Sequence, residues 1–200
     1  CPAAEGRALH STNMERKYGM RVITGTARGR RLKELPGLAT RPTTDKVKES
    51  LFNIVQFDIE GRKVLDLFGG IGQLGIEALS RGAEHVTFVD LSKAAAGVIR
   101  ENVKVCGFSE RAQVLQGDAL AFLSGCREKF GLVFLDPPYE SGLLEKTLET
   151  IAAIDIMAGN GIIVCESAVE RELPALDAPY EKGREYRYGK IKITLYRRNV

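Results

Sequence analysis

The chain is poor in the residue types that build metal sites and disulfide frameworks, and it lacks long apolar runs. Its 200 residues contain no Trp, only two His and four Cys, and no two cysteines form a Cys-x-x-Cys pair. Two histidines argue against a histidine-based metal site, and no apolar stretch reaches the roughly 20 residues that a membrane-spanning helix needs. No charged-then-apolar leader is visible either. Three cysteines sit in or beside apolar segments, which predicts reduced, buried thiols and favours the cytoplasm: Cys106, Cys126 and Cys165.

Positive charge, by contrast, is abundant and concentrated in two segments. Residues 16–48 carry ten Lys/Arg against two acidic residues, a local charge of +8 in a chain whose total is +3. Residues 182–198 carry seven basic residues and one acid. Such clusters predict a polyanionic partner such as nucleic acid, although a charge run is also typical of a plain solvated surface. In the first segment, three arginines are expected to bind phosphates: Arg28, Arg30 and Arg31.

The first 60 residues follow a different pattern from the rest of the chain. Residues 1–19 form a tail to which the sequence assigns no role. Residues 20–35 predict two short strands around a Gly-containing turn. Residues 41–55 have apolar side chains at helical spacing, with Thr43 or Thr44 as a cap before Asp45, and predict a helix. We therefore expect a small N-terminal extension over residues 20–59 and a larger domain over residues 60–200.

From residue 60 onward, short apolar segments alternate with helical segments. Strands that are apolar on both faces and separated by helices predict a parallel sheet covered by helices. Residues 185–198 alternate around a Tyr-Gly-Lys bend and predict an antiparallel hairpin. The sequence thus predicts an α/β fold with a mostly parallel sheet and a C-terminal hairpin. The expected strands cover residues 63–68, 85–90, 112–118, 131–136 and 161–167, and the expected helices cover 76–82, 93–107, 119–125 and 141–154.

A glycine-rich loop, GGIGQLG at residues 69–75, follows the first of these strands. It matches Gly-x-Gly-x-x-Gly at Gly70, Gly72 and Gly75, but such a loop suits any ligand that must contact backbone closely. Several carboxylates beside it would repel the pyrophosphate of a dinucleotide. They would favour S-adenosylmethionine, which has a sulfonium, an ammonium, a ribose diol and an adenine. Acidic residues stand at the ends of the first three strands: Asp66, Asp90 and Asp118.

Each of these acids has an expected role and a simpler alternative. Asp90 is placed to accept from both ribose hydroxyls, Asp118 from the adenine amino group, and Asp66 to face the amino-acid end of the donor through a water. The alternatives are turn formation for Asp90 and Asp118 and, for Asp66, bracing of the loop through backbone N–H groups. Their neighbours are expected to line the same donor site: Phe68, Leu91 and Ala119.

The tetrapeptide DPPY at residues 136–139 is the most specific motif, although a Pro-Pro pair after a strand can also be a plain turn. An exocyclic amino group on a nucleobase is a weak nucleophile because its lone pair is drawn into the ring. Two acceptors aimed at its hydrogens would direct that lone pair outward. The Asp136 side chain and the Pro137 carbonyl oxygen supply two acceptors, and consecutive prolines hold them still. Tyr139 offers a flat face for a flipped-out base.

The ordered series RPTTDKVKESLFNI, DLFGGIGQLGIEALSRGA, FVD, GD and DPPY resembles the RsmD family of ribosomal RNA guanine-N2 methyltransferases over residues 20–198. The resemblance implies a Rossmann-like class I methyltransferase with a seven-stranded sheet and an N-terminal hairpin-helix extension. It implies S-adenosylmethionine as donor and one guanine of small-subunit (16S) rRNA as substrate, within an assembling or assembled 30S subunit. By position, Asp136, Pro137, Pro138 and Tyr139 would hold the base, and Arg41, Pro42 and Thr43 would match the family's motif beside the active site.

This chain departs from the family pattern mainly in the glycine loop, where Gly69, Ile71 and Gln73 replace small residues, and Asp90 stands where relatives often have Glu. Other interpretations stay open. One is an adenine-N6 or protein-amide methyltransferase that shares DPPY, and another is a non-catalytic RNA-binding relative. A third is a nicotinamide-dependent oxidoreductase. We expect no metal ion, no membrane partner and a monomer.

Overall fold

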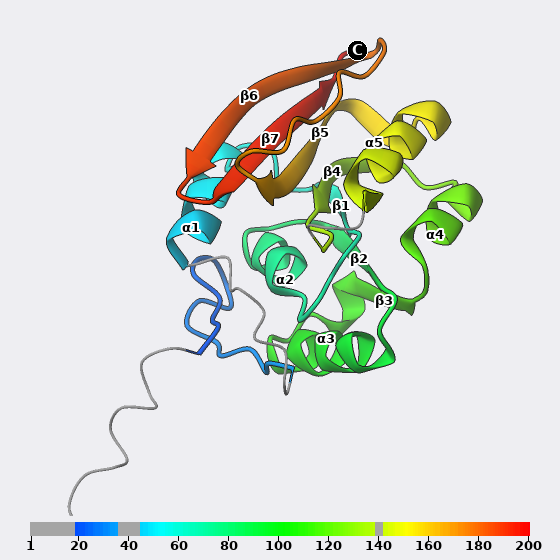
Figure 1. The fold of residues 1–200 in the computed structure, drawn as a ribbon. Coiled ribbons are helices and arrows are strands. Elements are labelled where there is room, and N and C mark those ends of the chain that lie inside the picture. The colour runs from blue at the N-terminus through cyan, green and yellow to red at the C-terminus, as the bar shows by residue number, and fades with distance from the viewer. Residues whose placement is uncertain (1–18, 36–44, 139–141) are drawn as a thin grey trace, which may run out of the picture.

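The computed structural model describes residues 19–35, 45–138 and 142–200 (Figure 1). Four predicted site residues, Arg41, Pro42, Thr43 and Tyr139, lie outside these ranges, as does nearly all of the predicted tail. The helices are α1 (Asp45–Ile54), α2 (Gln73–Ser80), α3 (Lys93–Val105), α4 (Ala119–Gly125) and α5 (Leu143–Ile154), with a 3₁₀ helix η1 at Ser109–Arg111. The strands are β1 (Lys63–Asp66), β2 (His85–Asp90), β3 (Ala112–Gln116), β4 (Phe130–Leu135), β5 (Met157–Ala168), β6 (Tyr180–Tyr188) and β7 (Ile191–Arg198).

The strands form one mixed sheet in the order β3-β2-β1-β4-β5-β7-β6. β1 pairs in parallel with β2 and β4, and β5 pairs in parallel with β4, whereas β7 is antiparallel to β5 and β6. The predicted α/β fold with a mostly parallel sheet and a C-terminal hairpin is confirmed. The chain winds outward from β1 to β3 on one side and from β4 to β5 on the other, so the winding reverses between β1 and β4. In open α/β sheets, ligands bind outside the carboxyl ends of the strands at such a reversal.

Helices cover both faces of the sheet, and each face has its own apolar cluster. One cluster contains residues of α1, α2 and α3, including Leu51, Ile76 and Ile99, and the other contains residues of α4 and α5, including Leu123 and Leu148. Each β1 residue after Lys63 is buried, as a strand with helices on both faces requires. Among the described residues, no helix is both long and apolar enough to cross a membrane.

The predicted hairpin over residues 20–35, here called the basic loop, forms less ladder than expected. Its two sides meet in a single antiparallel bridge between Arg21 and Arg31. Val22 N still donates across the loop to Arg30 O at 3.0 Å, and Gly29 N donates to Val22 O at 2.8 Å, but the next two backbone N–H groups on the first side donate to α2. Ile23 N and Thr24 N donate to the Glu77 carboxylate at 2.8 and 2.9 Å. The chain therefore reverses as expected and its two sides are hydrogen-bonded to each other, but the pairing is limited to one bridge and does not extend into two regular strands.

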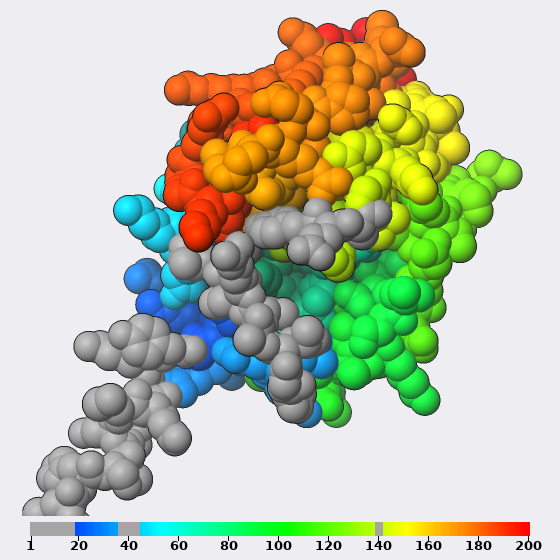
Figure 2. Space-filling model, in the orientation of Figure 1, coloured from blue at the N-terminus to red at the C-terminus, as the bar shows by residue number. Residues whose placement is uncertain are grey.

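The basic loop packs against the helices on one face of the sheet and shares their apolar cluster. Val22, Ala27 and Leu32 belong to the same apolar cluster as α1, α2 and α3. Figures 1 and 2 both place the blue N-terminal segment next to α1, and the buried Lys48 of α1 donates to Arg21 O at 2.7 Å. The domain boundary near residue 60 stays a prediction, but apolar contacts run across it.

Candidate active site

Three carboxyl side chains lie at the carboxyl ends of neighbouring strands, where the winding reverses. Asp66 ends β1, Asp136 follows β4, and Glu166 stands near the end of β5. Side chains alternate between the two faces of a strand, so each acid points to the same face as the residue two positions earlier. Those earlier residues pack in the cluster of α1, α2 and α3: Val64, Phe134 and Val164. We call these three acids the carboxylate group.

Asp66 is buried, with 3% of its surface exposed, and it braces the glycine loop. Its Oδ2 accepts a hydrogen bond from Gly75 N at 3.0 Å. Burial raises the pKa of Asp66 to about 7; the Gly75 N–H opposes this rise and the charge of Asp90 adds to it. The bracing role, foreseen as the simpler alternative for this residue, is therefore present.

Asp136 and Glu166 form the other part of the carboxylate group. The register of β4 and β5 places Leu135 beside Cys165, so the two acids follow at the same level of the sheet. Glu166 is buried, with 5% exposed. The pKa of Asp136 is raised well above its usual range by burial first, and then by the charges of Glu166 and Asp66. These carboxyls thus act on one another as like charges, an arrangement that a cationic ligand would relieve.

The glycine loop (residues 69–75) makes a tight turn between β1 and α2. Gly70 and Gly72 have φ of +57° and +82°, the left-handed region that favours glycine. Gly75 is required for another reason, since a Cβ there would lie 2.2 Å from the ring of Phe88 on β2. Ile71, which departs from the family pattern, has its side chain buried in the apolar cluster of α1, α2 and α3.

Asp90, at the end of β2, holds the loop from the other side. Its Oδ2 accepts from Gly70 N at 2.9 Å and its Oδ1 accepts from Ser92 N at 2.8 Å. An ionised carboxylate has about four acceptor sites, so two such bonds leave capacity for ribose hydroxyls. Asp90 therefore serves the turn and is also free to serve a ligand.

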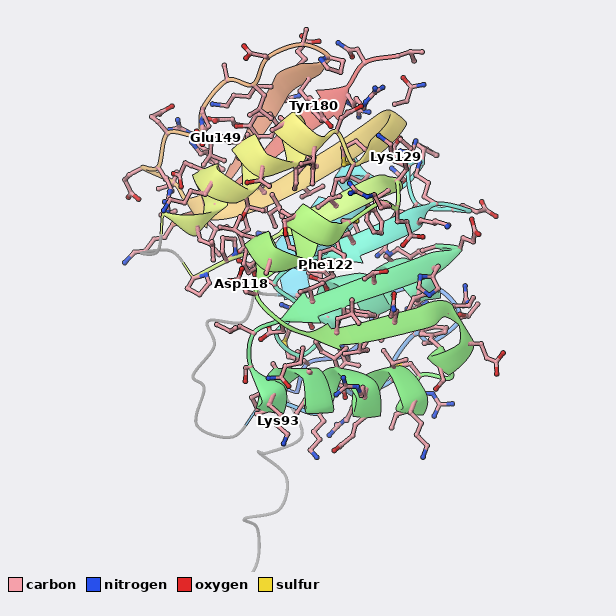
Figure 3. All side chains as sticks on the ribbon, turned by 90° about the vertical axis from the view of Figure 1, so that its right-hand side faces the viewer. Lys93, Asp118, Phe122, Lys129, Glu149 and Tyr180 are labelled. Carbon is pink, nitrogen blue, oxygen red and sulfur yellow. The ribbon has the colours of Figure 1, made fainter. Side chains whose placement is uncertain are left out.

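Asp118 caps a helix and is exposed at the same edge of the sheet. Its Oδ1 accepts from Ala121 N at 2.8 Å, which makes it the N-cap of α4. Figure 3 shows Asp118 at the start of α4. Of the predicted neighbours, Leu91 is 70% exposed, unusual for a large apolar residue, whereas Ala119 is buried and Phe68 is half-buried.

Comparisons with known proteins agree with this geometry. A model of the family described as "Conserved hypothetical protein 95" matches residues 20–197. Ribosomal RNA small subunit methyltransferase D of Escherichia coli K12 is 37% identical over 183 residues, which cover 90% of this chain and 91% of that protein. The chain belongs to the RsmD family.

Two further relatives support the assignment to the RsmD family. YlbH of Bacillus subtilis, named as a candidate rRNA methyltransferase, is 41% identical over 182 residues, covering 90% of this chain and 99% of that protein. A solved structure of the candidate methyltransferase YhhF from Escherichia coli matches with a TM-score of 0.80 at 36% identity, covering 92% and 99% of the two chains. The chain is a methyltransferase of the RsmD family with a class I fold, which uses S-adenosylmethionine.

The residues present fit the donor of the RsmD family. A group with a sulfonium and an ammonium suits carboxyls whose pKa values are raised by burial and by neighbouring acids, Asp90 for Asp66 and the other two members of the carboxylate group for Asp136. The positive φ of Gly70 and Gly72 presents backbone to a ligand at close range. No described group of three or more His, Cys, Asp and Glu is arranged to hold a metal ion.

The arginines predicted to bind RNA in this RsmD-family chain lie on the basic loop. Arg28, Arg30 and Arg31 are all exposed. The loop beneath them is fixed by α2, where Ala27 N donates to Ser80 Oγ at 2.9 Å and Thr26 N donates to Ser80 O at 2.9 Å. The cations thus stand on a backbone that is held in place.

Sequence reasoning missed several residues of this RsmD-family site. Glu166 could have been found, because it lies near the end of the predicted strand over residues 161–167 and the rule applied to the other strands also covers it. Glu77 and Asn102 gave no such signal. Each sits inside a predicted helix, and its partners in the basic loop are 53 to 69 residues away in the chain.

Proposed function

We propose that this protein methylates the exocyclic N2 amine of a guanine in small-subunit (16S) rRNA, with S-adenosylmethionine as donor. The observation that carries the proposal is the position of Asp136 and Pro137, directly after β4 and next to the winding reversal. There Asp136 lies close enough to Asp66, which braces the glycine loop, for the charge of Asp66 to raise its pKa. A base amine and a donor methyl can meet at one place only if their binding groups adjoin.

When bound, S-adenosylmethionine supplies an electrophilic methyl group on a sulfonium. The protein positions the acceptor. The Asp136 carboxylate and the Pro137 carbonyl oxygen would each accept a hydrogen bond from the amine, which directs the nitrogen lone pair toward the methyl carbon. Pro137 is buried and Pro138 follows it, so the carbonyl needs little reorganisation as charge develops. Most of the acceleration would come from this alignment.

The raised pKa of Asp136 suggests an order of steps, in which the donor binds before the carboxyl loses its proton. In the free protein, burial and the charges of Glu166 and Asp66 favour the protonated carboxyl. A bound cation has the opposite effect and favours the carboxylate. Asp136 would therefore become a full acceptor once the donor is in place, and it could then take the proton that the methylated amine releases.

The substrate assignment rests on the relatives and on charge. The Escherichia coli relative is named as a small-subunit rRNA methyltransferase, and the exposed arginines of the basic loop suit a phosphate backbone. Tyr139, Arg41, Pro42 and Thr43 keep their predicted roles beside the base, and Asp66, Phe68, Gly70, Gly72, Asp90, Leu91, Asp118 and Ala119 keep theirs in the donor site. The 30S subunit as partner, the monomeric state and the cytoplasmic location also remain predictions.

The decisive experiment identifies the modified nucleoside. Unmethylated 30S subunits and naked 16S rRNA are incubated with the protein and labelled donor, and the RNA is digested to nucleosides. We expect label in N2-methylguanosine. Label in methyladenosine would contradict the substrate, and donor binding without any transfer to RNA would support a non-catalytic relative.

A further inference from the structure

One buried side chain joins the basic loop to the glycine loop. Asn102 of α3 is 2% exposed. Its Oδ1 accepts from Lys33 N at 2.7 Å, and its Nδ2 donates to Lys33 O at 3.0 Å and to Ile71 O at 2.9 Å. Both hydrogens of the amide are used, one on each loop, and its oxygen is used as well. The amide therefore holds Lys33 from both of its backbone groups and fixes the middle of the glycine loop.

The surroundings of Asn102 make this link stiff. One turn earlier on α3, Ile99 packs against the glycine loop, since a Cβ on Gly69 would lie 2.8 Å from its Cδ1. On the other side, Lys33 Nζ pairs with Glu101 at 2.5 Å. Polar groups this deeply buried cost free energy if a partner is lost, so the three bonds are expected to persist or break together.

We propose that Asn102 is a positioning residue that couples donor binding in the glycine loop to RNA binding on the basic loop. A ligand on either loop further restricts the backbone that Asn102 holds, so the second ligand loses less conformational freedom when it binds. The coupling must be equal in both directions, because linkage between two sites is reciprocal. The RNA side of this inference rests on the proposed function, whereas the donor side does not.

The first test uses the donor alone. Hydrogen exchange of residues 30–35 and 69–75 is measured with and without S-adenosylmethionine, in the wild type and in Asn102→Ala. We expect the donor to slow exchange in both segments of the wild type, by about fivefold or more, which is the lower end of typical coupling. In Asn102→Ala it should slow only residues 69–75. Equal slowing of residues 30–35 in the variant, or no slowing there in the wild type, would overturn the proposal.

Matched variants separate coupling from mere stability. Asn53→Ala removes an exposed helical asparagine and should leave the coupling unchanged. Lys33→Pro removes the N–H that donates to Asn102 without opening the core, and Lys33→Ala removes only the side chain. If Asn102→Ala fails to fold, the two variants Lys33→Ala and Lys33→Pro test the coupling instead. Coupling should survive in Lys33→Ala and be lost in Lys33→Pro, and any other pattern would contradict the proposal.

The second test adds RNA. Donor affinity is measured by calorimetry with and without a saturating short RNA hairpin that has guanines in its loop. The wild type should bind the donor about fivefold more tightly when the RNA is present. Asn102→Ala should bind the donor with the same affinity with and without RNA. Failure of methyl transfer to guanine with the exchange coupling intact would count against the proposed function alone. Intact transfer without coupling would count against this inference alone.

Discussion

The protein buries carboxylates in two places, and the two differ in what surrounds them. Glu77 of α2 is fully buried, and its oxygens accept from Ile23 N, Thr24 N and the Arg81 Nε at 2.8, 2.9 and 3.0 Å. In the carboxylate group, by contrast, the charges that act on Asp136 are those of Glu166 and Asp66. A buried charge with its own cation and N–H donors is built into the fold. A carboxyl whose pKa is raised by two neighbouring acids suits a ligand that brings positive charge.

The largest effect on stability is expected at Glu77, the buried carboxylate that has its own cation and N–H donors. Glu77→Ala should lower the free energy of unfolding by about 3–5 kcal/mol, because it leaves Arg81 and two backbone N–H groups without their acceptor. Urea denaturation measures this. Glu149→Ala on the exposed side of α5 is the control and should change little. If Glu77→Ala loses no more unfolding free energy than Glu149→Ala, the bonds to Glu77 do not stabilise the fold and the contrast with the carboxylate group fails.

Asp136→Ala should affect activity and not stability. We expect methyl transfer to fall about 1000-fold, within the range that loss of one preorganised polar contact produces, while donor affinity falls far less, because the other acids at this edge of the sheet remain. Removal of the Asp136 carboxyl, on which only the negative charges of Glu166 and Asp66 act, should not destabilise the fold at pH 8. Labelled-methyl transfer and calorimetry measure the two quantities, and a parallel loss of donor affinity would place Asp136 in the donor site instead.

The raised pKa of Asp66 predicts that the free energy of unfolding depends on pH. Its pKa is about 7 in the folded protein and near 3.8 when unfolded. Between these values the folded state keeps a proton that the unfolded state releases, so stability falls as pH rises, by at most about 1.4 kcal/mol per pH unit. Asp66→Asn can still accept from Gly75 N but does not titrate. Its unfolding free energy should lose the part of the slope that Asp66 contributes, keep the part from Asp136, and exceed that of the wild type at pH 8, whereas its donor affinity should drop. An unchanged slope would show that Asp66 is compensated after all.

The smallest effect on the fold is expected on the basic loop that Glu77 anchors. Replacing Arg28, Arg30 and Arg31 together by Ala should weaken RNA binding roughly tenfold. It should also reduce the slope of log affinity against log salt by about 2, as for three contacts to a single strand. Stability and the proposed preference for guanine should be retained, because phosphate contacts position a nucleic acid without reading its bases. An unaltered salt slope would mean that another surface binds the RNA.

The sequence predicted the sheet well because its strands are short, apolar and separated by helices. The strand at 85–90 and the helix at 119–125 match their predicted limits, and the acids at strand ends follow from the geometry of parallel sheets. The basic loop was predicted less well. Several of its backbone N–H groups donate to Glu77, Ser80 and Asn102, which lie 53 to 69 residues further along the chain, and no local pattern in residues 20–35 reveals these bonds. Long-range side-chain-to-backbone bonds of this kind override strand propensity.

These same separations have a consequence for synthesis on the ribosome. The segment that carries the arginines is translated before the helices that fasten it, because Ser80 and Asn102 are added more than 50 residues later. Until those helices emerge, the amides of Ile23, Thr24, Ala27 and Lys33 lack the side-chain acceptors that they have in the folded protein. The nascent chain must therefore wait for α2 and α3 before this segment can dock, and docking comes after the synthesis of both helices although the segment leaves the exit tunnel before them.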